Sequence, residues 1–322
     1  MNFTKTSIFK IGCIFAFIFS VISCNNNSQD KSSKLKVVCT TTMVTDLVKN
    51  IGQDSIQLTG LMGAGVDPHL YKASEGDVNR IKSADVVFYN GLHLEGKMAE
   101  IFERLPDMGK ASYAVSDGIP EAKLISSENF ASNYDPHIWF SINNWIDAAT
   151  LVAEKLSEND PESASYYQEN LRKYKVQLEK TQKEIVEEIS LLPKDQRILV
   201  TAHDAFSYFG QEFNFQVIGL QGISTATEAG TRDVLDLANF IVENNIPAIF
   251  IESSVPKQTI LALQNAVQSK GADVKLGGTL YSDALGNSGT PEGTYIGMFK
   301  ANVNTIVNAL KNNKKEDGHS GN

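Results

Sequence analysis

Residues 161–192, PESASYYQENLRKYKVQLEKTQKEIVEEISLL, contain no glycine and no proline after the first position. Their apolar or weakly polar residues recur every three or four positions, at Tyr167, Leu171, Tyr174, Leu178, Thr181, Ile185, Ile189 and Leu192. This spacing traces one face of a helix, and the other faces are rich in Lys, Glu and Gln. Pro193 ends the pattern. The stretch predicts a helix of 32 residues, about 48 Å long at 1.5 Å per residue.

Strand-like and helix-like runs alternate on both sides of this helix. Strands are predicted over 35–40, 56–61, 86–90, 198–202, 215–219, 248–252 and 274–276. Helices are predicted over 44–51, 74–82, 234–244, 256–269 and 295–310, with Ser74 opening a capping box. Such alternation is typical of α/β domains with mostly parallel sheets.

The domain organisation follows from this pattern. We predict an α/β protein of two lobes, residues 35–160 and 194–312, joined by one long rigid helix over 161–193. The alternative for the helix is a coiled coil with a partner chain. A single tyrosine-rich stripe inside a two-lobed chain favours an internal brace instead.

Composition and charge exclude several classes of protein. The 322 residues include 29 basic and 38 acidic ones, for a net charge of −9. A general nucleic-acid binder needs a basic surface, so the acidic net charge argues against that class and no nucleic-acid partner is predicted. The composition also excludes a coiled coil, a collagen-like chain and a fully disordered chain. An acidic surface suits a cationic ligand, but it is also a common means of solubility.

The N-terminus, MNFTKTSIFKIGCIFAFIFSVISC, has the features of an export signal. Lys5 and Lys10 precede an apolar run over 11–22, which at 12 residues is shorter than the roughly 20 of a membrane span. The run ends at Ser23-Cys24, and this arrangement resembles the bacterial lipoprotein signal. The resemblance implies that residues 1–23 are removed and that Cys24 carries lipid, which places the protein extracytoplasmically on a membrane anchor. A plain secretory signal is the alternative.

The segments next to the folded part are polar. Residues 24–34 predict a flexible tether, and residues 313–322 predict a disordered tail. Loss of residues 1–23 removes two lysines and no acid, so the mature charge is 27 − 38 = −11. Cys39 is then the one cysteine left besides Cys24, and we expect a buried, inert thiol there rather than a nucleophile.

Histidines follow predicted strands in both halves of the chain. The tripeptide Asp-Pro-His occurs twice, ending at His69 and His137, and His203 follows the strand over 198–202. In open α/β sheets ligands bind beyond the carboxyl ends of strands, so the three imidazoles are candidates to converge between the lobes. Three neutral imidazoles suit a first-row divalent cation, and Asp283, in a loop after the last strand, is the candidate fourth ligand. Taken singly, each has an ordinary alternative as a surface or turn residue.

Five stretches together resemble the metal-binding lipoproteins of bacterial ABC importers, the manganese/zinc/iron solute-binding family. They are GVDPH (65–69), NGLHLE (90–95), DPHIW (135–139), TAHDAF (201–206) and YSDAL (281–285), in family order over nearly the whole mature chain. The resemblance implies two lobes joined by one long helix and a metal ligand set of His69, His137, His203 and Asp283. It also implies a binding protein without catalytic residues, which carries one divalent ion to an ABC permease. We expect a monomer.

The family resemblance limits the choice of metal ion but does not identify a single one. Strongly manganese-selective members of the family often carry Glu where this chain has His203. Zinc-dedicated members often have a long histidine-rich loop, whereas residues 100–135 contain no histidine. Manganese or zinc is therefore predicted as the transported ion, and iron remains open.

Other polar residues are candidates for supporting roles. Asp135 and Asp204 are candidates to orient imidazoles. Glu252 and Arg232 are candidates to lie near the site, as an ion pair or in contact with the ligands, and ordinary surface or core-edge ion pairing is the alternative for these two. His93 is interpreted as structural.

Two other functions compete with metal transport. A secreted zinc hydrolase would need an open coordination position and a carboxylate base, but the sequence contains no His-Glu-x-x-His. An adhesin-like surface protein would need a dedicated binding surface, for which the sequence gives no sign.

Overall fold

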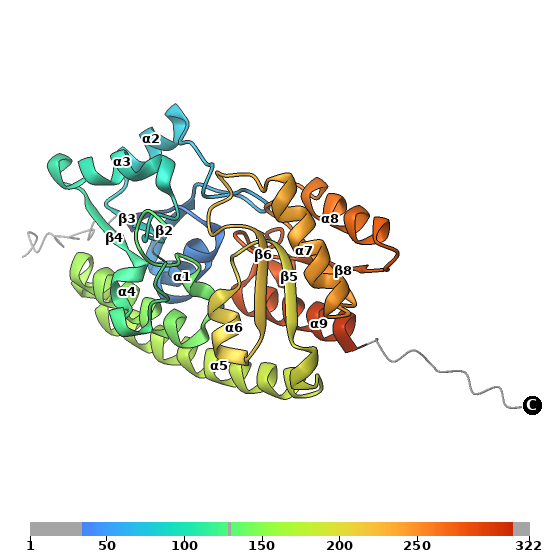
Figure 1. The fold of residues 1–322 in the computed structure, drawn as a ribbon. Helices are drawn as coiled ribbons and strands as arrows, with labels where there is room; N and C mark the ends of the chain where they lie inside the picture. The colour runs from blue at the N-terminus through green and yellow to red at the C-terminus, as the bar shows by residue number, and fades with distance from the viewer. Residues whose placement is uncertain (1–33, 128–129, 312–322) are drawn as a thin grey trace, which may run out of the picture. The chain divides into compact units, whose positions relative to one another are not determined.

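The long helix is α5, Ala164–Ser190, in the computed structural model, which describes residues 34–127 and 130–311. Its 27 residues span about 40 Å, and the predicted first turn is instead a 3₁₀ turn, Pro161–Ser163. The predicted stripe from Tyr167 to Ile189 is buried. In Figure 1, α5 runs along the lower edge of the fold, beneath α4 and α6. The prediction of one long connecting helix is confirmed.

The first lobe is built on a four-stranded parallel sheet of order β2-β1-β3-β4. Its strands are β1 Leu35–Cys39, β2 Ile56–Gly60, β3 Val86–Tyr89 and β4 Ala111–Ala114. Its helices are α1 Thr42–Gly52, α2 Glu75–Ser83, α3 Ala99–Arg104 and α4 Ile142–Asn159. The predicted strands and helices agree within about two residues, whereas β4, only four residues long and half-buried, has no recognisable pattern.

The second lobe carries two parallel strand pairs, β5-β6 and β7-β8, with β5 next to β7. Its strands are β5 Ile198–His203, β6 Gln216–Gln221, β7 Ala248–Glu252 and β8 Lys275–Leu280. Its helices are α6 Ser207–Phe213, α7 Thr231–Glu243, α8 Gln258–Ser269 and α9 Tyr295–Lys311. Strand β8 extends past the predicted 274–276 through Gly277 and Gly278, which hid it from an apolar pattern.

Local sequence accounts for the start of α2. The Ser74 hydroxyl accepts a hydrogen bond from the Asp77 N–H at 3.2 Å, and the Asp77 carboxylate accepts one from the Ser74 N–H at 2.9 Å. This reciprocal pair is the predicted capping box. It fixes the end of the loop that leads from β2 into α2.

One apolar core extends through both lobes and α5. Trp145 of α4 stacks on Tyr295 of α9 with ring centroids 5.0 Å apart. Phe140, just before α4, stacks on Phe206 at 4.2 Å. Aromatic contacts between the lobes of this kind add to their covalent connection through α5, so the lobes share buried surface as well as a helix.

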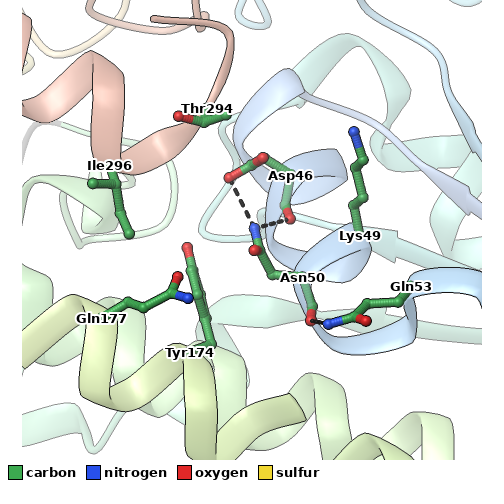
Figure 2. Close-up of a pocket in the computed structure, with 8 residues that line it drawn as sticks. All are labelled: Asp46, Lys49, Asn50, Gln53, Tyr174, Gln177, Thr294 and Ile296. Atoms are coloured by element: carbon green, nitrogen blue, oxygen red, sulfur yellow. Dashed lines mark hydrogen bonds between the residues drawn. The ribbon is translucent and has the colours of Figure 1, made fainter. Parts of the chain in front are cut away.

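A polar cavity of about 360 Å³ lies where α1, α5 and the start of α9 meet (Figure 2). Its lining residues are Asp46, Lys49, Asn50, Gln53, Tyr174, Gln177, Thr294 and Ile296. The Asp46 carboxylate accepts a hydrogen bond from the Tyr295 N–H at 3.0 Å and thereby joins the two lobes. Burial raises the pKa of Asp46 to about 6. None of the four candidate metal ligands lines this cavity.

Several predictions concern parts of the chain beyond those described. The signal peptide over 1–23, Cys24 and the tail over 313–322 lie outside the described residues, and so does the tether up to residue 33. Within the described ranges, no helix is both long enough and apolar enough to cross a membrane. Cys39 is buried as predicted, and burial raises the pKa of its thiol well above the usual value.

Candidate metal centre

The four predicted ligands come from four separate positions in the fold. His69 lies in the loop between β2 and α2, and His137 lies just before α4. His203 is the last residue of β5, and Asp283 lies three residues past β8. All four are buried, and one potential ligand atom from each lies within 4.8 Å of the others. The structure therefore brings together, between the lobes, all four residues that the sequence singled out.

The ligand atoms face one another around a common centre. The Nε2 atoms of His69 and His137 are 3.4 Å apart. Asp283 Oδ2 lies 3.2 Å from His203 Nε2 and 3.9 Å from His69 Nε2. The second oxygen, Asp283 Oδ1, lies 3.5 Å from His137 Nε2.

These separations fit a metal ion. Zinc–nitrogen bonds of about 2.0–2.1 Å in a tetrahedron place neighbouring ligand atoms about 3.3 Å apart. His203 Nε2 and Asp283 Oδ1 are buried and have no hydrogen-bond partner among the described residues. Buried polar atoms without partners are costly, and an ion at the centre would satisfy both.

His137 is oriented by the aspartate two residues before it. Asp135 Oδ1 accepts a hydrogen bond from the His137 N–H at 2.9 Å and lies 2.7 Å from the ring Nδ1. A proton on Nδ1 leaves the Nε2 lone pair pointing at the centre of the site. The predicted orienting role of Asp135 is therefore visible in the geometry.

Glu252, at the end of β7, contacts both the backbone and the ring of His203. Its Oε1 accepts a hydrogen bond from the His203 N–H at 2.8 Å, and its Oε2 lies 2.5 Å from the ring Nδ1. Sequence spacing could not show this contact, because β7 and β5 lie 49 residues apart and meet only in the folded sheet. Glu252 does not pair with Arg232, which is exposed and lies 3.6 Å from Asp236 instead.

Two further sequence candidates have other contacts. Asp204 accepts a hydrogen bond from the Ser207 hydroxyl at 2.8 Å rather than from an imidazole. His93 is exposed, has a positive φ of 62°, and packs its ring 6.2 Å from that of Phe130. It does not belong to the four-residue cluster.

Burial and charge set the protonation of the cluster. Burial lowers the pKa of His69 to about 3, so this imidazole is neutral. Burial also lowers the pKa of His203, but the Asp283 and Glu252 carboxylates outweigh it and raise that pKa well above its usual value. Burial alone would raise the pKa of Asp283, but the three imidazoles lower it by more. The net pKa lies below the usual value of an aspartate, so the carboxyl is ionised.

Fold and site together define a two-lobed α/β binding protein that encloses a small His₃Asp donor set between its lobes. The family model for ZnuA, the zinc-uptake complex component A, periplasmic, matches residues 37–309, and the chain belongs to this family. Its members are binding proteins of transport systems and not enzymes.

Named relatives and a solved structure agree with this assignment. The chain is 46% identical over 295 residues to the manganese-binding lipoprotein MntA of Bacillus subtilis (strain 168), covering 91% of this chain and 96% of the relative. It is 46% identical over 274 residues to the zinc-binding protein TroA of Treponema pallidum (strain Nichols), covering 85% and 88%. The structure of the periplasmic zinc-binding protein TroA superposes with a TM-score of 0.84 over 86% of this chain and 99% of that one.

Proposed function

We propose that this protein binds one divalent transition-metal ion, manganese or zinc, between its lobes and delivers it to an ABC permease. The ion is the transported ligand and not a resident cofactor. The observation that carries this proposal is the convergence of His69, His137, His203 and Asp283 within 4.8 Å in a buried space. We assign these four residues as the metal ligands.

The donor set supports a first-row divalent ion. Three imidazole nitrogens and one carboxylate suit zinc, manganese or iron, whereas calcium and magnesium prefer oxygen donors throughout. Zinc outranks manganese and iron(II) in intrinsic affinity for such a set, so the isolated protein should bind zinc more tightly. The two relatives at 46% identity are named for manganese and for zinc, so their names favour neither ion. Metal supply therefore decides the ion that is transported, and iron remains a candidate.

The location and partners are part of the same proposal. Residues 1–23 serve as a lipoprotein signal peptide, and Cys24 carries the lipid that holds the protein outside the cytoplasm. Residues 24–34 form a tether to the lobes over 35–160 and 194–312, which the helix over 161–193 joins. We propose a monomer that docks on its permease. Labelling with radioactive palmitate should mark the wild type and fail to mark Cys24→Ala.

A hydrolytic function finds less support in the site. A catalytic zinc needs an open position for water and a nearby carboxylate base. Here four protein ligands surround the centre, while Glu252 and Asp135 are engaged with imidazole Nδ1 atoms. The family model describes a zinc-uptake component and the two relatives are named as metal-binding proteins, and none of these names points to an adhesin or a hydrolase.

The test is metal content under competition. Protein purified from membranes in detergent, exchanged against equimolar manganese, zinc and iron(II), should retain one divalent ion per chain by elemental analysis. His69→Ala and Asp283→Ala should each weaken binding by at least about 100-fold, because each removes one of four ligands. Arg232→Ala, at an exposed position away from the cluster, is the control and should bind like the wild type. Wild-type protein without stoichiometric metal would reject the function, and full affinity in both ligand variants would reject the ligand set.

A further inference from the structure

The two copies of Asp-Pro-His use their aspartates differently. In both, the carboxylate accepts a hydrogen bond from the backbone N–H of the histidine, at 2.8 Å for Asp67 to His69 and 2.9 Å for Asp135 to His137. Asp135 also faces the imidazole of its own histidine. Asp67 instead accepts, on its second oxygen, a hydrogen bond of 2.6 Å from the Thr225 hydroxyl.

The Asp67–Thr225 bond crosses between the lobes. Asp67 belongs to the loop between β2 and α2 in the first lobe. Thr225 belongs to the loop over 222–230, between β6 and α7, in the second lobe. The bond therefore fastens the loop that carries His69 to the opposite lobe.

Thr225 is unlike its neighbours in the loop. Across 222–230, all of which the structure describes, Thr225 is the single buried residue, at 8% exposure, and its neighbours are partly or fully exposed. Among the described residues, the Asp67–Thr225 bond is the one hydrogen bond that joins this exposed loop to the first lobe. The loop over 61–73 also comes close to the second lobe at Gly65, where an added Cβ would lie 3.4 Å from the Ser253 carbonyl oxygen.

Other hydrogen bonds between the lobes join the loops of His137 and Asp283 or lie in the core. The Trp139 indole N–H donates to the Ser282 carbonyl at 3.0 Å, and the Tyr208 hydroxyl donates to the Asp135 carbonyl at 2.9 Å. Tyr295 N–H donates to Asp46 at 3.0 Å, and Leu285 N–H donates to the Thr42 hydroxyl at 2.8 Å. Both acceptors are on α1, which packs against α5 and α9. None of these other hydrogen bonds involves the loop over 61–73, so among the described residues the Asp67–Thr225 bond is the one that ties the His69 loop to the second lobe. Figure 1 shows the loops after β2 and after β6 on the side of the fold away from α5.

We propose that the Asp67–Thr225 hydrogen bond is a latch between the lobes that sets how fast the bound metal leaves. While it is closed, one Asp67 oxygen holds the His69 backbone and the other holds the second lobe, so His69 cannot move away from Asp283. When it opens, the loop over 61–73 is free to carry His69 out of the site. Thr225 is a positioning residue in this scheme, since it reaches the metal only through Asp67 and His69. The proposal rests on the metal-binding function proposed above.

The test is the dissociation rate of zinc from the full-length protein, measured by stopped flow into excess chelator at several chelator concentrations. Thr225→Val keeps the shape and removes the hydroxyl, and should speed dissociation about tenfold, as expected for a lost hydrogen bond to a charged group. Thr225→Ser keeps the hydroxyl and should stay within about twofold of the wild type. Ser224→Ala is the matched control, because among the described residues the Ser224 hydroxyl bonds only within the loop, accepting from the Ala226 N–H at 3.2 Å.

The possible outcomes distinguish a failure of the latch proposal from a failure of the metal-binding function on which it rests. A wild type that binds no stoichiometric zinc would overturn the proposed function. If the wild type binds zinc but zinc leaves Thr225→Val no faster than it leaves the wild type or Ser224→Ala, the latch alone is overturned. If Thr225→Val unfolds, the contrast between Thr225→Ala and Thr225→Ser carries the same test, with urea unfolding as the measure of intact structure.

Discussion

At the residue scale, the site depends on carboxylates that fix imidazoles. Asp135 and Glu252 each contact the Nδ1 of a histidine, so the Nε2 atoms of His137 and His203 face the centre. Asp135 lies two residues from its histidine and could be found in the sequence. Glu252 comes from a neighbouring strand, and its sequence surroundings, AIFIE, show only a buried strand.

Glu252→Gln should weaken metal binding by about 10–100-fold. An amide NH₂ beside the His203 N–H would lose the backbone contact, whereas an NH₂ beside the ring Nδ1 would drive the ring proton toward Nε2, where the metal binds. The metal dissociation constant and the absorption spectrum of the cobalt form measure this, together with urea unfolding of the metal-free protein. An unchanged affinity and spectrum would contradict the positioning role, whatever happens to stability.

At the scale of single elements, α5 shows what the spacing of apolar residues can and cannot predict about a helix. Its apolar residues predict the buried face correctly, because a helix in contact with a core must repeat every 3.6 residues. The start at Ala164 rather than Pro161 is a detail that periodicity does not fix. The single stripe in a two-lobed chain favours an internal brace over a coiled-coil partner, and the packing of α5 against α1, α4 and α9 agrees with the brace.

Leu178→Ala in α5 should lower the free energy of unfolding by about 2–5 kcal/mol, because the side chain is fully buried and its loss leaves a cavity. Val176→Ala, two residues earlier on the same helix, is the control. Val176 is 56% exposed, so its truncation should change stability by less than about 0.5 kcal/mol. Urea denaturation of both variants gives the comparison, and equal losses would mean that the face is wrongly assigned.

At the scale of the whole described fold, the two lobes share one core. Aromatic stacks and hydrogen bonds from backbone N–H groups to side chains of α1 join them, in addition to the chain connection through α5. Closure around a ligand by a wide hinge motion would have to separate these buried contacts. We therefore expect metal uptake and release to involve loop movement rather than rotation of whole lobes.

Asp46, at the junction of the lobes, should make stability depend on pH. Its folded pKa of about 6 lies above the ordinary 3.8, so the folded protein binds the proton more tightly than the unfolded chain. The contribution of Asp46 to the free energy of unfolding is therefore greatest below about pH 4 and falls as the pH rises through 6. The total loss is up to about 3 kcal/mol, at 1.36 kcal/mol per pKa unit. Urea unfolding of the wild type and Asp46→Asn from pH 4 to 7 should diverge in favour of the variant. Parallel curves would show that Asp46 is not the cause.

The sequence by itself determined the alternation of strands and helices, the long helix and the four residues that converge. These follow from local rules: side-chain periodicity reports burial, and strand ends in α/β sheets report where ligands gather. The family resemblance predicted that these four residues act together as one set of metal ligands.

Only the tertiary structure decided that Glu252 supports His203, that Arg232 lies elsewhere, and that Asp67 reaches Thr225. The two Asp-Pro-His copies are identical in sequence, yet one aspartate turns to its own imidazole and the other to the opposite lobe. The physical reason is that a hydrogen bond depends on which group lies within about 3 Å, and chain folding brings partners 49 or 158 residues apart to that distance.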